Sequence, residues 1–437
     1  MVSTRTIGRR IFLRQAAGAF LGKIGFPYVI SSSALGKNGC VAAGERIVMG
    51  AVGTGGQGTR HIGGGIWVEG GGFLSKPDVQ FVAVCDVNAK NRANARNIVN
   101  KYYGNQDCAA YIDFRELLVR EDIDAVLIAA GDRWHPLVTI AAAKAGKDIY
   151  CEKPLSLTIN EAIGMAKNVR RYGRVFQLGT QQRSSREFRF ACELVRNGYI
   201  GEVKKVTVGV GGPPAYSICD LPAQPVPLWL DYDTWLGPVP YRPYNSNFVA
   251  GWMAYRDLAG GEMTNWGAHH FDIAQWALGM DDSGPVEIIP PNGKDVKVLT
   301  YRYANGVQMV RDPDELKAAS GQDNGLMFSG TTGRIAVWRY ELKTWPESLC
   351  KTRLHIDDIH LYESKNHQDN FLDCVRTRRR TISDIEIGRR SITVCHLGNI
   401  AYHLGRPLKW EPQIEQFPAD EQANRLLSRP YRSPWCL

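Results

Sequence analysis

The stretch Ile47-Val48-Met49-Gly50-Ala51-Val52-Gly53-Thr54-Gly55-Gly56-Gln57-Gly58 decides the fold. Its first half is a short apolar run suited to a buried parallel strand. Its second half matches G-x-G-x-x-G, in which the first glycine permits a tight turn, the second lets backbone amides approach a pyrophosphate, and the third lets the next helix pack close to the strand. The stretch therefore predicts a strand, a turn and a helix whose N-terminus binds a dinucleotide.

A second apolar run, Val79–Cys85, ends at Asp86. An acidic residue at this strand end accepts hydrogen bonds from the ribose hydroxyls of NAD and repels the 2′-phosphate of NADP. The alternative is a carboxylate that caps the next helix. Arg92 follows within reach of the adenosine end. The sequence therefore favours NAD as the cofactor and does not exclude NADP.

Two further runs, Ala125–Ala130 and Asp148–Cys151, are separated by a helical stretch over Pro136–Ala145. This alternation predicts a doubly wound parallel sheet. Polar clusters follow both strands, as Asp132-Arg133-Trp134-His135 and Glu152-Lys153-Pro154. Ligands bind beyond the carboxyl ends of such strands, so these are positions for chemistry.

The composition limits the classes of protein to which the chain can belong. The 437 residues are 44% hydrophobic and 22% charged, which suits a soluble globular protein of two or three domains. No apolar run approaches the ~18 residues of a membrane span, so no stable membrane insertion is expected. Six of the 53 basic residues and none of the 44 acidic ones lie in residues 1–44, which leaves 47 basic against 44 acidic residues elsewhere. This nearly neutral body argues against nucleic-acid binding.

The histidines and the ten cysteines give no metal-binding pattern, because no Cys-x-x-Cys pair and no convincing histidine cluster occurs. We therefore expect no metal.

The N-terminus, Gly8-Arg9-Arg10-Ile11-Phe12-Leu13-Arg14, precedes a weakly apolar region. It resembles a twin-arginine (Tat) export signal, and the alternative is a basic amphipathic helix. The resemblance implies passage through the Tat translocon to the periplasm. We predict a signal over 1–44, a Rossmann domain over 45–174, a substrate and oligomerisation domain over 175–410 and a tail over 411–437.

A third motif lies in the second domain, Gly260-Gly261-Glu262-Met263-Thr264-Asn265-Trp266-Gly267-Ala268-His269-His270-Phe271-Asp272. Together with the glycine motif, Trp134-His135 and Glu152-Lys153-Pro154-Leu155-Ser156, it resembles the Gfo/Idh/MocA family of glucose–fructose oxidoreductase and inositol dehydrogenase. The order and spacing of these motifs carry the resemblance over nearly the whole chain from Arg46 to about Trp410.

The resemblance implies a Rossmann domain followed by an α+β domain with an open, mostly antiparallel sheet that carries helices on one face. Strand patterns at Val203–Val210, Val286–Ile289, Val296–Tyr303 and Gly306–Val310 agree with such a sheet. The open face implies a homo-oligomer, a dimer or a tetramer. An aromatic run over residues 229–255 either stacks on sugar rings or packs its own loop.

The resemblance also implies site residues. Lys153 and His269 flank the nicotinamide and the sugar, and a lysine or an imidazole can exchange the hydroxyl proton. Trp134, His135 and Glu152 join the cofactor site. Further residues are expected to reach the substrate, namely Gln181, Arg183, Asn265 and Trp266.

Asn265 departs from the family pattern, which has an aspartate four residues before the catalytic histidine. Helical spacing places Asn265, His269 and Asp272 on one face. We therefore expect that Asp272 orients His269 or that His270 shares its role.

These features lead to three hypotheses. The first is an exported NAD(P)-dependent oxidoreductase that acts on a secondary hydroxyl of a sugar or glycoside, at C3, with a tightly bound cofactor. The second is a glycoside hydrolase or lyase that uses transient C3 oxidation followed by elimination. The third is a non-catalytic sugar-binding relative.

Overall fold

The computed structural model describes residues 41–66, 68, 71–217 and 219–437. The predicted export signal therefore lies outside the described residues, apart from positions 41–44. Residues Ile47–Leu437 form one unit that contains both predicted folded domains. Among the described residues, no helix combines the length and the apolar character needed to cross a membrane.

Six parallel strands form the first sheet, in the order β3-β2-β1-β4-β5-β6. The strands are β1 Ile47–Val52, β2 Val79–Cys85, β3 Ala109–Tyr111, β4 Ala125–Ile128, β5 Asp148–Cys151 and β6 Phe176–Leu178. The helices of this domain are α2 Gly56–Gly63, α3 Ala89–Tyr103, α4 Phe114–Leu118, α5 His135–Lys144 and α6 Ile159–Arg171. This strand order is that of dinucleotide-binding Rossmann folds, so the predicted fold of the first domain is confirmed.

The turn between β1 and α2 requires glycine. Gly53 has a φ of 84°, and a Cβ at this position would lie 2.6 Å from the main chain of Ala129. A Cβ at Gly58 would lie 2.1 Å from the carbonyl oxygen of Gly53. Because only glycine tolerates these approaches, the N-terminus of α2 lies directly at the edge of the sheet.

Eight strands form the second sheet, in the order β13-β12-β11-β7-β10-β9-β8-β14. They are β7 Val203–Gly209, β8 Glu287–Ile289, β9 Leu299–Arg302, β10 Gln308–Arg311, β11 Gly325–Gly330, β12 Arg334–Trp338, β13 Glu341–Trp345 and β14 Leu408–Lys409. Only the β7–β10 pair is parallel among the pairings of these described strands. The mostly antiparallel sheet is thus confirmed.

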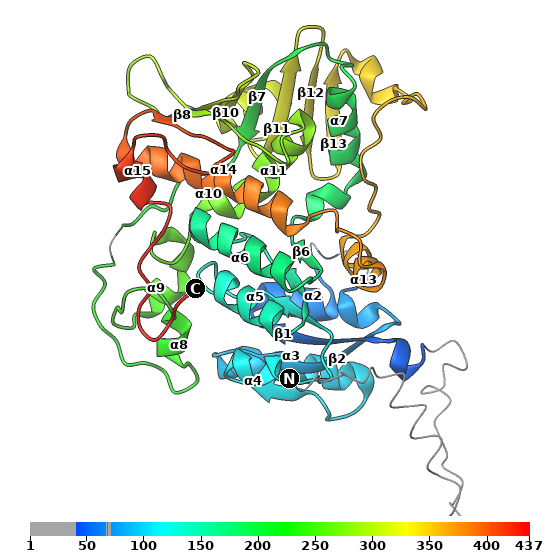
Figure 1. Ribbon diagram of the computed structural model, residues 1–437, viewed down its shortest axis with the longest axis vertical. Coiled ribbons are helices and arrows are strands. Elements are labelled where there is room, and N and C mark those ends of the chain that lie inside the picture. The colour runs from blue at the N-terminus through cyan, green and yellow to red at the C-terminus, as the bar shows by residue number, and fades with distance from the viewer. Residues whose placement is uncertain (1–40, 67, 69–70, 218) are drawn as a thin grey trace, which may run out of the picture. The chain divides into compact units, whose positions relative to one another are not determined.

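One helix of the second domain, α14, packs against the first domain. Helix α14 contacts α6 of the Rossmann domain and α11 of its own domain, and Figure 1 shows α14 between the two sheets. The helices are α7 Arg186–Arg196, α8 Tyr232–Leu236, α9 Ser246–Ala250, α10 Glu262–Asn265, α11 Gly267–Leu278, α12 Pro313–Ser320, α13 His367–Thr377, α14 Ile385–Leu404 and α15 Glu421–Arg425. The expected helix between Gly261 and Gly279 is broken at Trp266, which separates α10 from α11.

The C-terminal tail returns to the Rossmann domain. Tyr431 donates a 2.6 Å hydrogen bond to Glu161 of α6, and Trp435 packs edge-on against Trp134 with ring centroids 4.7 Å apart. Figure 1 shows this red segment running from α15 past α8. The tail therefore supports the wall of the first domain on which Trp134 lies.

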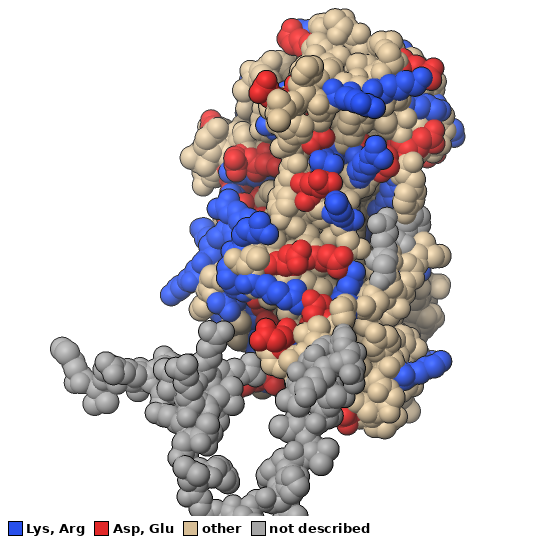
Figure 2. Space-filling view, turned by 90° about the vertical axis from the view of Figure 1, so that its right-hand side faces the viewer, with Lys and Arg blue, Asp and Glu red and all other residues tan. Residues whose placement is uncertain are grey.

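Charged side chains are mixed on the face shown in Figure 2, where lysines and arginines are interspersed with aspartates and glutamates. This distribution agrees with the nearly balanced charge of residues 45–437.

Candidate active site

A cavity of about 550 Å³ lies at the carboxyl ends of β1, β2, β4 and β5. Its lining runs from Asp86 past Gly55 and Gly56 to Lys153. A Cβ at Gly56 would meet nothing within 4 Å, so open space lies directly beside the N-terminus of α2. The volume and the exposed backbone at this helix end fit the pyrophosphate and the two nucleosides of a dinucleotide.

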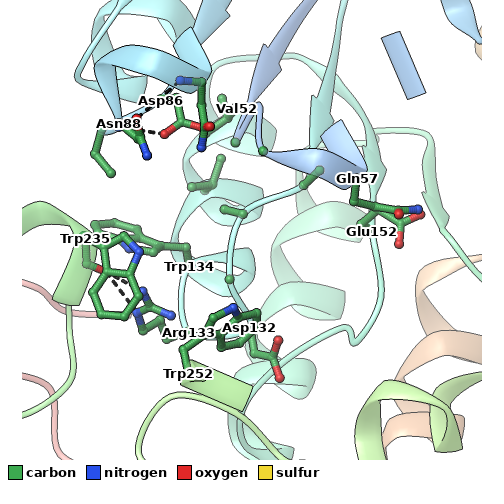
Figure 3. Close-up of a pocket in the computed structure, with 18 of the residues that line it drawn as sticks. Val52, Gln57, Asp86, Asn88, Asp132, Arg133, Trp134, Glu152, Trp235 and Trp252 are labelled. Carbon is green, nitrogen blue, oxygen red and sulfur yellow. Dashed lines mark hydrogen bonds between the residues drawn. The ribbon is translucent and has the colours of Figure 1, made fainter. Parts of the chain in front are cut away.

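Asp86 lies at the adenosine end of this cavity, where Figure 3 shows it beside Asn88. Its carboxylate accepts hydrogen bonds from the amides of Thr54 at 2.7 Å and Asn88 at 2.8 Å. The side chain of Asn88, rather than Asp86, caps α3. Burial raises the pKa of Asp86, which lines the cavity at the end of β2, where the ribose hydroxyls of NAD would donate to an acidic partner and a 2′-phosphate would be repelled.

Arg92 points away from this cavity. Its Nη1 donates a 2.5 Å hydrogen bond to the carbonyl oxygen of Asp86, and Arg92 does not line the cavity. The residues present therefore fit NAD, with Gly53, Gly55 and Asp86 holding its phosphate and ribose groups.

Aromatic side chains form the outer wall of the cavity. Trp134, Trp229, Trp235 and Trp252 line it, and Figure 3 shows three of them around Arg133. The guanidinium of Arg133 lies 4.4 Å from the centre of the Trp235 ring and donates to the carbonyl oxygen of that residue. Trp229, Trp235 and Trp252 of the aromatic run over residues 229–255 thus line the cofactor cavity, whereas Tyr232, Tyr244 and Phe248 pack into a buried cluster within the same segment.

His135 lies behind this wall. It is fully buried, and its Nδ1 lies 2.6 Å from the carbonyl oxygen of Pro154, to which it donates. His135 does not line the cavity. The structure therefore places it as a support for the Glu152-Lys153-Pro154 segment.

A buried polar row separates this cavity from a second one. His61 Nε2 lies 2.7 Å from Glu152 Oε1, which also accepts a 2.9 Å hydrogen bond from Gln181. Gln57 Nε2 lies 3.3 Å from His61 Nε2. Burial favours the neutral form of Glu152, but His61, Lys153 and Gln181 outweigh burial and lower its pKa to about 2. Glu152 is therefore a fixed carboxylate.

Lys153 lies at the inner end of the cofactor cavity. Its Nζ donates a 2.5 Å hydrogen bond to Oδ1 of Asn265 in α10. Asn265 Nδ2 in turn donates to Glu262 Oε1 at 3.1 Å. The sequence analysis gave Glu262 no role, although its carboxylate, one turn before Asn265 in α10, holds the amide nitrogen so that the amide oxygen meets the lysine.

His269 and His270 follow in α11 and are both buried. Burial, followed by the charge of Lys153, lowers the pKa of His269 well below its ordinary value, and its Nδ1 has no hydrogen-bond partner among the described residues. His270 donates to Oδ1 of Asn324 at 2.7 Å and stacks on Trp266, and burial lowers its pKa to about 4. Both imidazoles are thus neutral, and each keeps a buried Nδ1 without a hydrogen-bond partner among the described residues.

Asp272 does not bind His269. Its oxygens accept hydrogen bonds from Arg183 at 2.7 and 2.9 Å and from Ser391 at 2.6 Å. Arg183 also binds Asp281 at 2.7 Å and is 1% exposed. The structure therefore places Asp272 and Arg183 in a buried ion-pair cluster, because the carboxylate of Asp272 meets Arg183 from the segment after β6 and Ser391 of α14.

The second cavity, of about 510 Å³, lies on the far side of the polar row and is lined by Gln181 and Arg339 among others. Gln182 also lines it and is 3% exposed, and neither its Oε1 nor its Nε2 has a partner among the described residues. Gln368 Oε1 is buried there in the same state. Unsatisfied amides at a cavity wall fit a ligand that carries several hydroxyl groups.

The sequence analysis named Asp132 only as part of the polar cluster after β4, and it did not name Arg339. Asp132 lines the cofactor cavity, is 3% exposed, and has its pKa raised to about 7 by burial. Its position after β4 was the available signal. Arg339 lies 4.7 Å from the Trp266 ring, and no motif marks it. Within the described residues, no group of three or more histidine, cysteine or acidic side chains could hold a metal ion.

The fold and the site together define a two-domain dinucleotide-dependent oxidoreductase. Residues 47–180 match the family described as "Oxidoreductase family, NAD-binding Rossmann fold", and residues 192–437 match "Oxidoreductase family, C-terminal alpha/beta domain". The chain therefore belongs to the Gfo/Idh/MocA oxidoreductase family and carries an NAD-binding domain.

Individual relatives are distant. The chain is 25% identical to the uncharacterized oxidoreductase YrbE of Bacillus subtilis over 84% of this chain and 97% of that protein. It is 27% identical to the myo-inositol 2-dehydrogenase of Thermotoga maritima over 52% of this chain, and the match spans only 60% of that relative. The aldose-aldose oxidoreductase of Caulobacter crescentus, solved with glycerol, has the same fold with a TM-score of 0.57, 19% identity, and coverage of 83% of this chain and 99% of that one.

Proposed function

We propose that the protein is an NAD-dependent oxidoreductase that oxidises a secondary hydroxyl of a sugar or glycoside, at C3. The observation that carries this proposal is the position of Lys153 and Asn265 at the inner end of the cofactor cavity. The second cavity lies behind the buried row of His61, Glu152 and Gln181 and does not contain Lys153, so the substrate of this proposal binds in the first cavity, beside Lys153.

The chain's own residues supply the proton chemistry. NAD bound in the first cavity would take up the hydride that leaves the carbinol carbon. Lys153 Nζ holds the substrate hydroxyl and exchanges its proton, while Asn265 fixes the lysine by accepting one of its hydrogen bonds. In addition to Lys153 Nζ, the buried neutral imidazole of His269 offers a ring nitrogen to the same hydroxyl. Glu152, held by His61 and Gln181, fixes the backbone from which Lys153 extends.

The experiment compares Lys153→Met with a matched control, Lys144→Met, at an exposed position in α5. NAD reduction is followed with a panel of sugars and glycosides. Lys153→Met should lower kcat by 10²–10⁴, in the range of general acid–base catalysis, with NAD affinity kept. Product analysis by NMR locates the new carbonyl and tests C3. Full activity of Lys153→Met would refute the assignment.

We further propose that the protein is exported through the Tat pathway to the periplasm as a homo-oligomer, a dimer or a tetramer, with NAD tightly bound. The paired arginines near the N-terminus support export. A periplasm without an NAD pool requires a cofactor that is retained and recycled by a second sugar or carbonyl compound. Denaturing protein purified without added nucleotide should release stoichiometric NAD(H) by mass spectrometry. Cofactor-free protein would contradict retention, and light scattering measures the oligomer.

Redox-assisted cleavage of a glycosidic bond is the second candidate. Cleavage needs another proton-transfer group, because oxidation at C3 makes the C2 proton more acidic but does not remove it. His270 is engaged by Asn324, whereas the buried Asp132, with a pKa of about 7, lies in the same cavity as Lys153. Release of an aglycone without net NADH formation would favour this candidate over simple dehydrogenation.

A further inference from the structure

A third cavity, of about 300 Å³, lies apart from the two described above. It is enclosed by the start of α6, the loop around Pro213 and Pro214, the end of α14 and the C-terminal tail. Its volume is at the lower end of the range for small-molecule sites. The space therefore suits a small metabolite or ion.

The lining of this cavity is basic. Arg256, Arg429 and His403 line it, and among its described lining residues there is no aspartate or glutamate. Arg256 Nη1 lies 3.0 Å from His403 Nδ1, and Arg429 donates to the carbonyl oxygen of Arg256. Burial lowers the pKa of both guanidinium groups, and for Arg429 the charge of Arg256 lowers it further. Two like charges thus share a partly desolvated space.

The acidic side chains nearest to Arg256 and Arg429 bind other groups. Asp257 forms an ion pair with Arg242. Glu161 accepts hydrogen bonds from Tyr431 and from the main-chain amide of Thr158. Neither carboxylate lines the cavity, although the charge of Asp257 acts on both arginines and the charges of Glu161 and Asp132 act on Arg429. The groups that face the cavity itself are therefore cationic or neutral.

Asn399 adds a hydrogen-bond acceptor to the lining of this cavity. Its Nδ2 donates a 2.9 Å hydrogen bond to the carbonyl oxygen of Gly260, and its Oδ1 is buried without a partner among the described residues. An acceptor oxygen of this kind needs a donor, such as a hydroxyl group. Together, the cations and this acceptor match a ligand with an anionic group and a hydroxyl.

We propose that this cavity binds a small anion, a phosphate or carboxylate group on a hydroxylated metabolite, through Arg256 and Arg429. Guanidinium groups bind both kinds of anion with paired hydrogen bonds. The site connects to the active site through one residue: the carbonyl oxygen of Gly260 accepts from Asn399, and its amide donates a long, 3.5 Å hydrogen bond to Asp132 Oδ2. An anion here is therefore placed to alter the loop that carries α10 and Asn265.

The test is calorimetric titration of the full protein without nucleotide, so that it is independent of catalytic activity. The titrants are inorganic phosphate, glycerol 3-phosphate and malate, against chloride at equal ionic strength. The variants are Arg256→Gln, which leaves the Arg429 contact to the backbone in place, and Arg425→Gln, an exposed control in α15 outside the cavity.

We expect saturable binding of at least one phosphate or carboxylate titrant, weakened about tenfold or more by Arg256→Gln and unchanged within about twofold by Arg425→Gln. The tighter titrant distinguishes a phosphate from a carboxylate ligand. Circular dichroism establishes that Arg256→Gln is folded. Absence of saturable binding, or equal affinity in Arg256→Gln and the unmodified protein, overturns the proposal.

Discussion

Asp132→Asn tests whether a buried carboxyl in the cofactor cavity titrates near neutral pH. Asp132 is 3% exposed, and burial raises its pKa from the ordinary 3.8 to about 7, against the opposing charge of Lys153. Asparagine keeps the shape and an oxygen that accepts from Gly260 N, but it does not titrate. The substitution therefore isolates the proton-linked part of the stability.

The sign follows from proton linkage. Between pH 4 and 7 the unfolded chain has released the Asp132 proton while the folded protein still binds it, so this residue makes stability fall as pH rises. At about 1.36 kcal/mol per pKa unit, the shift corresponds to about 4 kcal/mol in total. About 3 kcal/mol of this loss falls between pH 5 and pH 8.5. Asp132→Asn should therefore gain about that much stability relative to the unmodified protein across this interval.

The measurement is the free energy of urea unfolding of nucleotide-free protein at pH 5 and pH 8.5. Asp107→Asn, at an exposed turn, is the control and should show no such pH-dependent gain. A stability difference between Asp132→Asn and the unmodified protein that is the same at both pH values would refute a carboxyl that titrates near 7.

Three other predictions follow from single contacts. Arg183→Met leaves the buried Asp272 unpaired and should cost about 3–5 kcal/mol of unfolding free energy in chemical denaturation, whereas a loss below about 1 kcal/mol would contradict the buried ion pair. Asp86→Ser removes the carboxylate from the adenosine end, so NAD should bind about 10–100-fold more weakly while NADP binds more tightly in fluorescence titration; unchanged NADP affinity would count against its role. Trp435→Ala removes the ring that supports Trp134 and should weaken NAD binding by up to about tenfold without lowering kcat, and equal NAD retention would show that the tail does not support the cavity wall.

The Rossmann half was predictable because its signals are local. The strand over Ile47–Val52, the glycine turn and the strand ending at Asp86 lie in short continuous segments, and each appears within a residue of its predicted bounds. In the second domain, the strands β7 to β10 were located, but β11, β12 and β13 were not. Strand β11 pairs with β7, more than a hundred residues earlier, so its position depends on a distant partner rather than on its own pattern.

The site was predictable only in part, for a related reason. The motifs marked Lys153 and Asn265, which line the cofactor cavity, because each lies in a recognisable sequence segment; His269 lines neither of the two large cavities. The motifs gave no information on which side chains pair across the fold. Asp272 was expected beside His269, yet it binds Arg183, and the sequence separation of these two residues hides the pairing. Helical spacing gives only the face on which a residue lies, and its partner is determined by the element packed there.

Asn265 shows how a departure from a family pattern is compensated within a few residues. An aspartate at this position would form an ion pair with Lys153, and an ion pair favours the protonated amine. The amide accepts the same 2.5 Å hydrogen bond without a charge, while Glu262 accepts from its other end at 3.1 Å and fixes its orientation. The negative charge that an aspartate would place beside Lys153 thus lies one helical turn away, on Glu262. It acts on the lysine only through the amide of Asn265, which it polarises. Lys153 is thus oriented by an uncharged acceptor, and a lysine held in this way beside the substrate hydroxyl is the arrangement that an acid–base role in alcohol oxidation requires.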